Sequence, residues 1–115
     1  MDERESRVAA AIDEDGTIIG LATAGATRDE DSPTAWELYS MNVVAEQQGS
    51  GVADDLMRVT ARDSDATVWV LAENMRAQSF YSRHGFRAEG ATAVDEVTGA
   101  CEIRMVRRAG RSGPS

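Results

Sequence analysis

The sequence has no lysine, one cysteine (Cys101) and one histidine (His84) among its 115 residues. A single cysteine excludes an internal disulfide and a cysteine-based zinc site, and a single histidine leaves little for a metal site or a histidine-based triad, so no metal is expected. No apolar run approaches the roughly 18–20 residues that span a bilayer. The first five residues lack the basic-then-apolar order of a secretory signal. We therefore expect a cytoplasmic protein with no membrane partner.

Acidic residues outnumber basic ones, since 20 Asp and Glu stand against 12 arginines for a net charge of -8. A polyanion would meet mostly repulsion, which predicts that the protein has no nucleic-acid partner. An apolar share of 42% is ordinary for a folded soluble chain, and the length allows one compact domain. We expect that domain over residues 1–107 and a disordered tail, rich in Gly, Ser and Arg, over 108–115.

Apolar periodicity and turn residues predict six strands and two helices in the order β-β-β-α-β-α-β-β. The third and fourth strands flank a helix and should run parallel, whereas the hairpins should be antiparallel. The predicted fold class is α/β (α+β): a mixed, mostly antiparallel sheet with a central parallel pair and helices packed on it. The strands are expected at about 8–12, 18–27, 35–44, 67–71, 86–94 and 101–106, and the helices at about 52–63 and 74–83.

A glycine-rich turn, Gln48-Gly49-Ser50-Gly51-Val52-Ala53, lies where a predicted strand gives way to a helix. Two glycines let the backbone bend and approach a ligand, and the helix start presents unpaired N–H groups with a partial positive charge. Such a turn suits a phosphate, although a Gly-x-Gly segment also fits a plain tight turn. A Walker loop is excluded because it needs a lysine. A dinucleotide fingerprint is excluded because Asp54 stands where its third glycine belongs.

Two motifs together resemble those of a known family. The pattern Gln-x-x-Gly-x-Ala at 48–53, which follows the strand at 38–43, resembles the acetyl-CoA loop of the GNAT superfamily of N-acetyltransferases. Residues 74–86 resemble that family's second signature, Asn-x-x-Ala-x-x-Phe-Tyr-x-x-x-Gly-Phe. The two motifs stand in the family's order, and the resemblance extends from about Val8 to Val106.

This resemblance implies an acetyl-CoA-dependent N-acetyltransferase. Such an enzyme would transfer the acetyl group to the primary amine of a small molecule or peptide, by direct attack of the amine on the thioester. The alternative is a non-catalytic acyl-CoA-binding regulatory module with a truncated GNAT fold.

The resemblance also implies which residues hold the cofactor. Asn74 and backbone groups of one strand would bind the pantetheine arm, and amides of the glycine-rich turn would bind the pyrophosphate. The strand residues are Met41, Asn42 and Val43, and the turn residues are Gln48, Gly49, Ser50, Gly51, Val52, Ala53 and Asp54. In two places the sequence departs from the family pattern. Gln48 replaces a frequent arginine, and Asp54 and Asp55 place carboxylates beside the expected pyrophosphate.

Tyr81 and Glu37 are the candidate catalytic residues. The resemblance places Tyr81 near the thioester sulfur, where its phenol can protonate the leaving thiolate; packing beside Phe80 is its alternative role. Strict alternation along the strand puts Glu37 on the same face as Met41 and Val43, so that it can look into the cleft as a general base. The alternative for Glu37 is a structural carboxylate that pairs with an arginine.

The single histidine and the single cysteine are expected to be structural. His84 directly precedes Gly85 and should cap the end of the second helix, where a partial positive charge is favoured. Cys101 falls within a predicted strand, and the chain has no second histidine to activate it. We expect it to be a buried, small apolar residue.

The start of the chain predicts association. Only about seven residues precede the first predicted strand, whereas members of the family usually open with a strand and one or two helices. The strand Val8–Ile12 is then expected to be an unprotected sheet edge, which proteins normally cover. A second copy is the expected cover, giving a homodimer. Another chain and a misplaced start codon are the alternatives.

Overall fold

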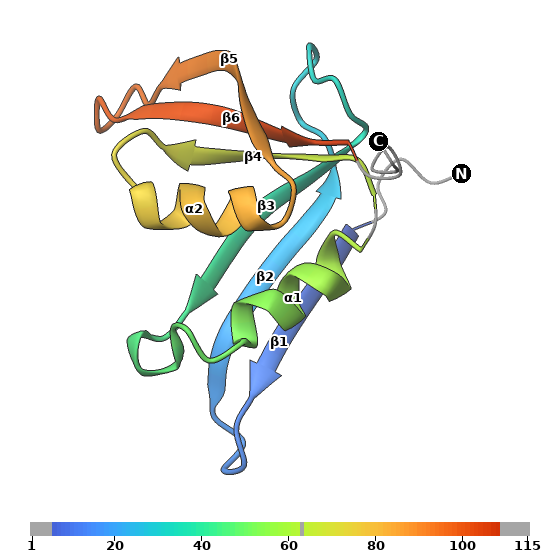
Figure 1. The fold of residues 1–115 in the computed structure, drawn as a ribbon, viewed down its shortest axis with the longest axis vertical. Helices are drawn as coiled ribbons and strands as arrows, with labels where there is room; N and C mark the ends of the chain where they lie inside the picture. The colour runs from blue at the N-terminus through green and yellow to red at the C-terminus, as the bar shows by residue number, and fades with distance from the viewer. Residues whose placement is uncertain (1–5, 63, 109–115) are drawn as a thin grey trace.

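The computed structural model describes residues 6–62 and 64–108. Residues 109–115, most of the tail predicted to be disordered, lie outside the described residues. Within the described ranges, no helix is long and apolar enough to cross a membrane. In chain order the elements are β1 (Ser6–Ile12), β2 (Ile18–Ala26), β3 (Trp36–Val43), the 3₁₀ helix η1 (Ala45–Gln47), α1 (Val52–Thr60), β4 (Ala66–Leu71), α2 (Met75–Arg83), β5 (Arg87–Val94) and β6 (Cys101–Arg107) (Figure 1). The predicted order is confirmed, although α1 ends earlier than expected and η1 was not predicted.

The six strands form one mixed sheet in the order β1-β2-β3-β4-β6-β5. β3 and β4 run parallel, as predicted, and the other neighbours are antiparallel. The parallel contact comprises only two residue pairs, Glu37↔Thr67 and Leu38↔Val68, whereas β4 and β6 pair over six. Beyond these two pairs β3 and β4 separate, which leaves a wedge that opens toward their carboxyl ends.

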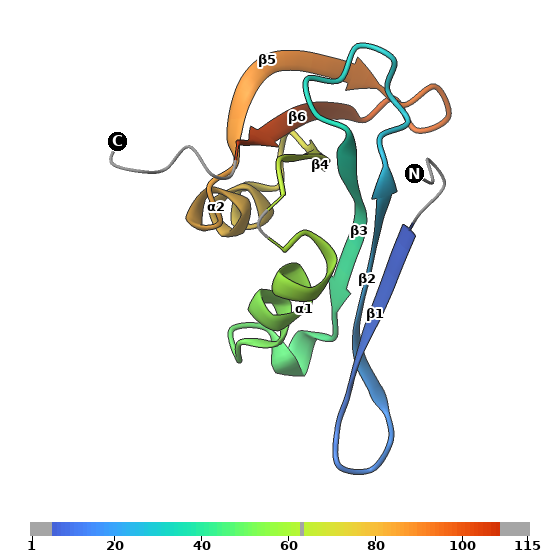
Figure 2. The same cartoon turned by 90° about the vertical axis from the view of Figure 1, so that its right-hand side faces the viewer.

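Both helices lie on the same side of the sheet (Figure 2). The apolar residues of α1 recur at helical spacing, so one face of the helix packs on the sheet and the acidic and basic residues stay outside. α2 begins at Asn74, whose side-chain oxygen accepts a hydrogen bond from the Ala77 N–H at 3.0 Å, and ends before Gly85, which has a left-handed backbone. The core between the helices and the sheet includes Leu38, Met57, Val68, Tyr81, Phe86 and Met105.

β3 contains a β-bulge at Tyr39 that changes the direction of its side chains. Ser40 and Leu38 pair with consecutive residues of β2, so Tyr39 between them is an extra residue. Leu38 and Met41, three positions apart, consequently both contact the core on the helix side. Glu37 faces the other side. The strict alternation that placed Glu37 on the face of Met41 is therefore wrong, because one inserted residue reverses the faces.

β1 forms one edge of the sheet, as predicted, and its side chains Val8 and Ile12 are 69% and 60% exposed. An uncovered edge offers unpaired backbone groups to another strand. We expect a second copy to cover β1, so light scattering over a concentration series should give twice the mass of one chain. A monomer at micromolar concentration would contradict this prediction.

Candidate active site

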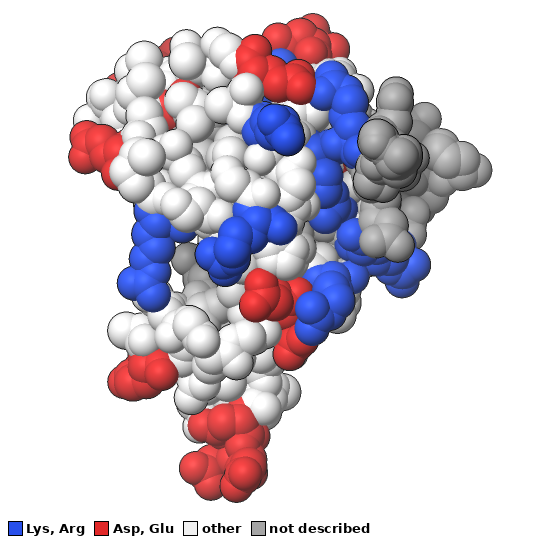
Figure 3. All heavy atoms as spheres, viewed as in Figure 1, with Lys and Arg blue, Asp and Glu red and all other residues white. Residues whose placement is uncertain are grey.

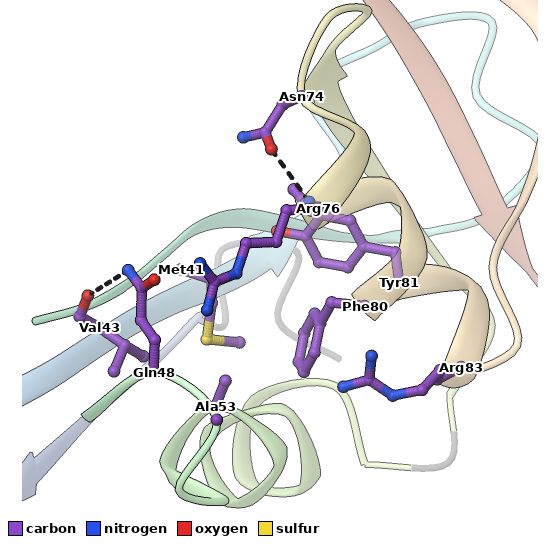
Figure 4. A pocket seen from close by; sticks show the side chains of 11 residues that line it. Met41, Val43, Gln48, Ala53, Asn74, Arg76, Phe80, Tyr81 and Arg83 are labelled. Carbon is purple, nitrogen blue, oxygen red and sulfur yellow. Dashed lines mark hydrogen bonds between the residues drawn. The ribbon is translucent and has the colours of Figure 1, made fainter. Parts of the chain in front are cut away.

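A cleft with a volume of about 330 Å³ opens on the helix side of the sheet, where β3 and β4 separate (Figure 4). Its walls come from the end of β3, the glycine-rich turn before α1, and α2. The sequence-predicted site residues that line it are Met41, Val43, Gln48, Gly49, Ala53, Asn74 and Tyr81. The other predicted cofactor residues do not line the cleft themselves: Asn42, Ser50, Gly51, Val52 and Asp54. Glu37 lies elsewhere.

The glycine-rich turn adopts a backbone that requires glycine. Gly49 and Gly51 have φ angles of +85° and +98°, and no described atom lies within 4 Å of the place where a Cβ would sit on either. Gly51 is the N-cap of α1, and no side chain caps the helix there. The first N–H groups of α1 are therefore available to an anion that approaches the turn.

The two carboxylates in the first turn of α1 are paired. The Asp54 Oδ1 lies 2.7 Å from the His84 Nε2, and Asp55 pairs with Arg58 one turn further on. His84 occupies the C-cap position of α2, as predicted, so its contact with Asp54 also joins the end of one helix to the start of the other. The charge of Asp55 is therefore partly offset by Arg58, and Asp54 is held toward the end of α2 by its hydrogen bond with His84.

Two arginines of α2, Arg76 and Arg83, also line the cleft, and the sequence analysis did not single them out. The Arg83 guanidinium lies 5.5 Å from the centroid of the Phe80 ring, which lines the cleft as well. Figure 3 shows basic side chains across the middle of the face that carries the helices. The sequence contains one signal that could have found this pair. The two arginines are seven residues apart, about two helical turns, which places both on one side of α2.

Tyr81 lines the cleft and is packed among aromatic rings. Its ring centroid lies 5.4 Å from that of Phe80 and 5.7 Å from that of Phe86, and the residue is 8% exposed. Its hydroxyl makes no hydrogen bond with any described residue, and burial raises the pKa of Tyr81 above its ordinary value of 10.0. The phenol is therefore protonated at neutral pH and can donate a hydrogen bond to a ligand.

Two residues predicted to bind the cofactor, Gln48 and Asn74, already use their side-chain amides in hydrogen bonds within the protein. The Asn74 Oδ1 caps α2, which leaves its Nδ2 group for a ligand. The Gln48 Nε2 donates a hydrogen bond of 3.2 Å to the backbone oxygen of Val43, which is one of the groups predicted to bind the pantetheine arm.

Glu37 lies on the opposite face of the sheet, and the expectation that it looks into the cleft is wrong. Its carboxylate accepts hydrogen bonds from the backbone N–H of Arg28 to Oε1 and from the Arg28 Nη2 to Oε2, each 2.9 Å long. Its side chain is 2% exposed. The hydrogen bond to Glu37 raises the pKa of Arg28. The structure thus shows Glu37 in the alternative arrangement, a buried carboxylate paired with an arginine.

The prediction that Cys101 is buried is also wrong. Cys101 is exposed at the first residue of β6, and its neighbour β5 is exposed along almost its whole length. Within residues 6–62 and 64–108, no group of three His, Cys, Asp or Glu side chains is placed to hold a metal ion.

A family model described as an acetyltransferase (GNAT) domain matches residues 4–88, which is most of the chain. The chain belongs to the GNAT acetyltransferase family. No curated protein sequence matches it closely enough to count as a relative. The strand, turn and helix that wall the cleft all fall within the part of the chain that matches the GNAT domain.

Solved structures share this GNAT fold. Nourseothricin acetyltransferase has a TM-score of 0.74 at 21% identity, over 90% of this chain and 65% of its own. The NatC complex bound to a Gag peptide and CoA has a TM-score of 0.73 at 15% identity, over 88% of this chain and 70% of its own. NAA60 of Arabidopsis thaliana, in complex with a bisubstrate analogue, has a TM-score of 0.71 at 18% identity, over 89% of this chain and 75% of its own. At these identities the likeness shows the predicted fold.

Proposed function

We propose that the chain is an acetyl-CoA-dependent N-acetyltransferase that acetylates a primary amine of a small molecule or peptide by direct transfer. The observation that carries this proposal is the wedge between β3 and β4, walled by an uncapped helix start on one side and by Tyr81 on the other. Membership of the GNAT family supports acetyl transfer. The NatC complex, which shares the fold, is bound to CoA.

The wedge suits the extended amide chain of pantetheine. β3 and β4 separate after two residue pairs, and no strand of the described residues lies between their diverging ends. Backbone groups on such edges accept an added strand-like ligand. Asn74 offers its Nδ2 group from the start of α2, on the wall opposite Met41 and Val43.

The turn and α2 together suit the phosphates of the cofactor. The uncapped N–H groups that follow Gly51 offer an anion-binding site at the start of α1. Arg76 and Arg83 bring two guanidinium groups to the same cleft, and arginine binds phosphate through paired N–H donors. In this proposal they supply the positive charge that the family often places at the position of Gln48.

When bound, acetyl-CoA supplies a thioester carbon that bonds to the amine nitrogen as the carbon–sulfur bond breaks. Tyr81 gives its phenolic proton to the departing thiolate. The raised pKa of Tyr81 keeps that proton on the phenol at neutral pH. It also makes the free energy of proton transfer to the thiolate more unfavourable than the roughly 2 kcal/mol expected from an ordinary phenol and an ordinary thiol. The same burial raises the proton affinity of the thiolate, which offsets the difference. A backbone N–H near Met41 or Asn42 stabilises the developing negative charge on the oxygen.

The described residues that line the cleft include no carboxylate and no imidazole. The helix-side cleft therefore supplies no general base, and in this proposal the acceptor amine loses its proton to water before or during attack. Such a cleft also fits the alternative of an acyl-CoA-binding module without chemistry. A panel of amines incubated with the protein and acetyl-CoA, with free thiol as the readout, decides between them. Thiol release that depends on both amine and protein supports the enzyme.

Acetyl-CoA is expected to raise the thermal midpoint of unfolding, and Gly51→Asp to abolish this rise. The new side chain puts a Cβ and a negative charge where the pyrophosphate approaches the backbone, at a φ of +98°. Gly90→Asp is the matched control, because Gly90 has a φ of +99°, open space around its Cβ position and a place in β5 away from the cleft. An equal rise in Gly51→Asp and Gly90→Asp would refute the placement of the pyrophosphate.

Tyr81→Phe is expected to keep cofactor binding and to lower kcat by about 100-fold or more, the usual size of a general-acid effect. The substitution removes the proton donor and keeps the ring that packs against Phe80 and Phe86. Steady-state rates are compared with the thermal shift caused by acetyl-CoA. A kcat within about twofold of wild type, with binding intact, would show that Tyr81 serves only in packing.

The rising limb of the kcat/KM profile against pH is expected to follow the pKa of the acceptor amine. Below that pKa the amine is protonated and cannot attack, and no carboxylate or imidazole of the described cleft residues takes its proton. Because burial holds the pKa of Tyr81 above 10.0, its proton remains throughout this range. Profiles for two acceptors of different pKa test the prediction. A rising limb at the same pH for both would point to a basic group of the enzyme instead.

A further inference from the structure

A fixed arginine lies on the face of the sheet opposite the helices. The Arg28 Nη2 donates to the Glu37 Oε2 at 2.9 Å, and the Arg28 backbone N–H donates to the Glu37 Oε1, also at 2.9 Å. The guanidinium carbon lies 4.1 Å from the centroid of the Tyr39 ring. A buried carboxylate and an aromatic ring therefore hold this side chain in one place.

The outer edge of this guanidinium is open. The Arg28 side chain is 63% exposed, although the carboxylate that holds it is 2% exposed. Its Nη1 makes no hydrogen bond with any described residue. The ion pair with Glu37 uses one edge of the planar Arg28 guanidinium. The other edge presents N–H donors in a fixed direction. Donors held in place lose little conformational freedom when an oxyanion binds them.

Arg28 lies beside the point where β3 and β4 begin to separate, at the closed end of the wedge. Tyr39 and Trp69 directly follow the last parallel pair of β3 and β4, and both face away from the helices, so they flank the wedge on this side. The Trp69 Nε1 donates to the Asp29 Oδ2 at 2.7 Å. The segment that carries Arg28 and Asp29 is thus fastened to β3 through Glu37 and to β4 through Trp69.

Arg104 and Glu37, two other charged groups near Arg28, already have partners. Arg104 donates to Asp29 at 3.3 Å and to Asp31 at 3.1 Å, and its side chain is only 9% exposed. Glu37 is paired with Arg28. Of the two arginines, Arg28 is therefore the one with accessible N–H donors, and these donors suit a planar anion such as a carboxylate.

We propose that the acceptor carries a carboxylate near its amine, and that Arg28 binds this carboxylate while the amine enters the wedge. The substrate class is then an amino acid. This inference rests on the proposed function, because it takes the cofactor to occupy the helix-side cleft and the acceptor to approach the thioester from the opposite face of the sheet. Arg28 is a substrate-binding residue, and Glu37 is a positioning residue that acts through it.

The test compares acceptors that share a side chain and differ in the carboxylate: phenylalanine with phenethylamine, histidine with histamine, and tryptophan with tryptamine. Because the carboxylate also lowers the pKa of the neighbouring amine, kcat/KM is expressed per concentration of unprotonated amine. The wild-type protein is expected to show a kcat/KM about tenfold or more higher for the amino acid of each pair, since a hydrogen-bonded charge contributes at least that much. The difference is expected in KM rather than in kcat, because the carboxylate takes no part in the chemical step.

The informative variant is the double substitution Arg28→Gln with Glu37→Gln. Removing Arg28 alone would leave a buried carboxylate unpaired and endanger the fold, whereas the two amides can still bond to each other. The preference for the amino acid is expected to fall about tenfold or more in this variant. The matched control is Arg108→Gln with Glu89→Gln, an ion pair between β5 and the residue that follows β6, outside the described wedge, and it should keep the preference.

Three results would overturn the inference: a wild-type preference for the decarboxylated amines, an undiminished preference in the Arg28/Glu37 variant that still shows the acetyl-CoA thermal shift, or no binding of amino acids. Binding is measured as the thermal shift that each N-acetylated amino acid causes in the CoA-saturated protein, so it is scored even if no amine in the panel is acetylated. Loss of the acetyl-CoA shift in the wild-type protein would instead overturn the proposed function.

Discussion

Backbone pairing between β3 and β4 stops after two residue pairs, although each strand stays paired along its other edge. β3 stays hydrogen-bonded to β2 as far as Val43, and β4 stays hydrogen-bonded to β6 as far as Leu71. The sheet therefore consists of two halves that touch at Glu37 and Leu38 and then diverge. Unpaired backbone groups on the diverging edges need a partner, and water or an extended ligand can supply it. The candidate active site follows from this divergence.

The helices keep the two halves at a fixed opening. α1 packs on the half formed by β1, β2 and β3, whereas Tyr81 of α2 packs in the core with Val68 and Met105 of the other half. The contact between Asp54 and His84 then joins α1 to α2 directly. The width of the cleft is therefore set by core packing and by one polar contact, so a ligand meets walls that are already in place.

Local patterns predicted much of this fold and site, and long-range pairing explains what they missed. Strand alternation, the break between the first two strands and the end of the second helix near residue 83 depend on neighbours in the chain, and each was predicted close to its true position. The bulge at Tyr39 depends on the register of β3 against β2, which no local pattern reveals, and it moved Glu37 to the wrong face in the prediction. The contact of Asp54 with His84 likewise depends on how two helices meet.

The basic groups at the cleft have a chemical consequence of their own. Arg76 and Arg83 line it, and the chain has no lysine anywhere in its 115 residues. A lysine at either place would set a nucleophilic amine next to an activated acyl group. A guanidinium stays protonated at any pH the protein meets and cannot compete for the acyl carbon. In the proposed enzyme the cationic side chains at the cleft are therefore ones that the acyl donor cannot modify, and the chain offers no side-chain amine for self-acylation.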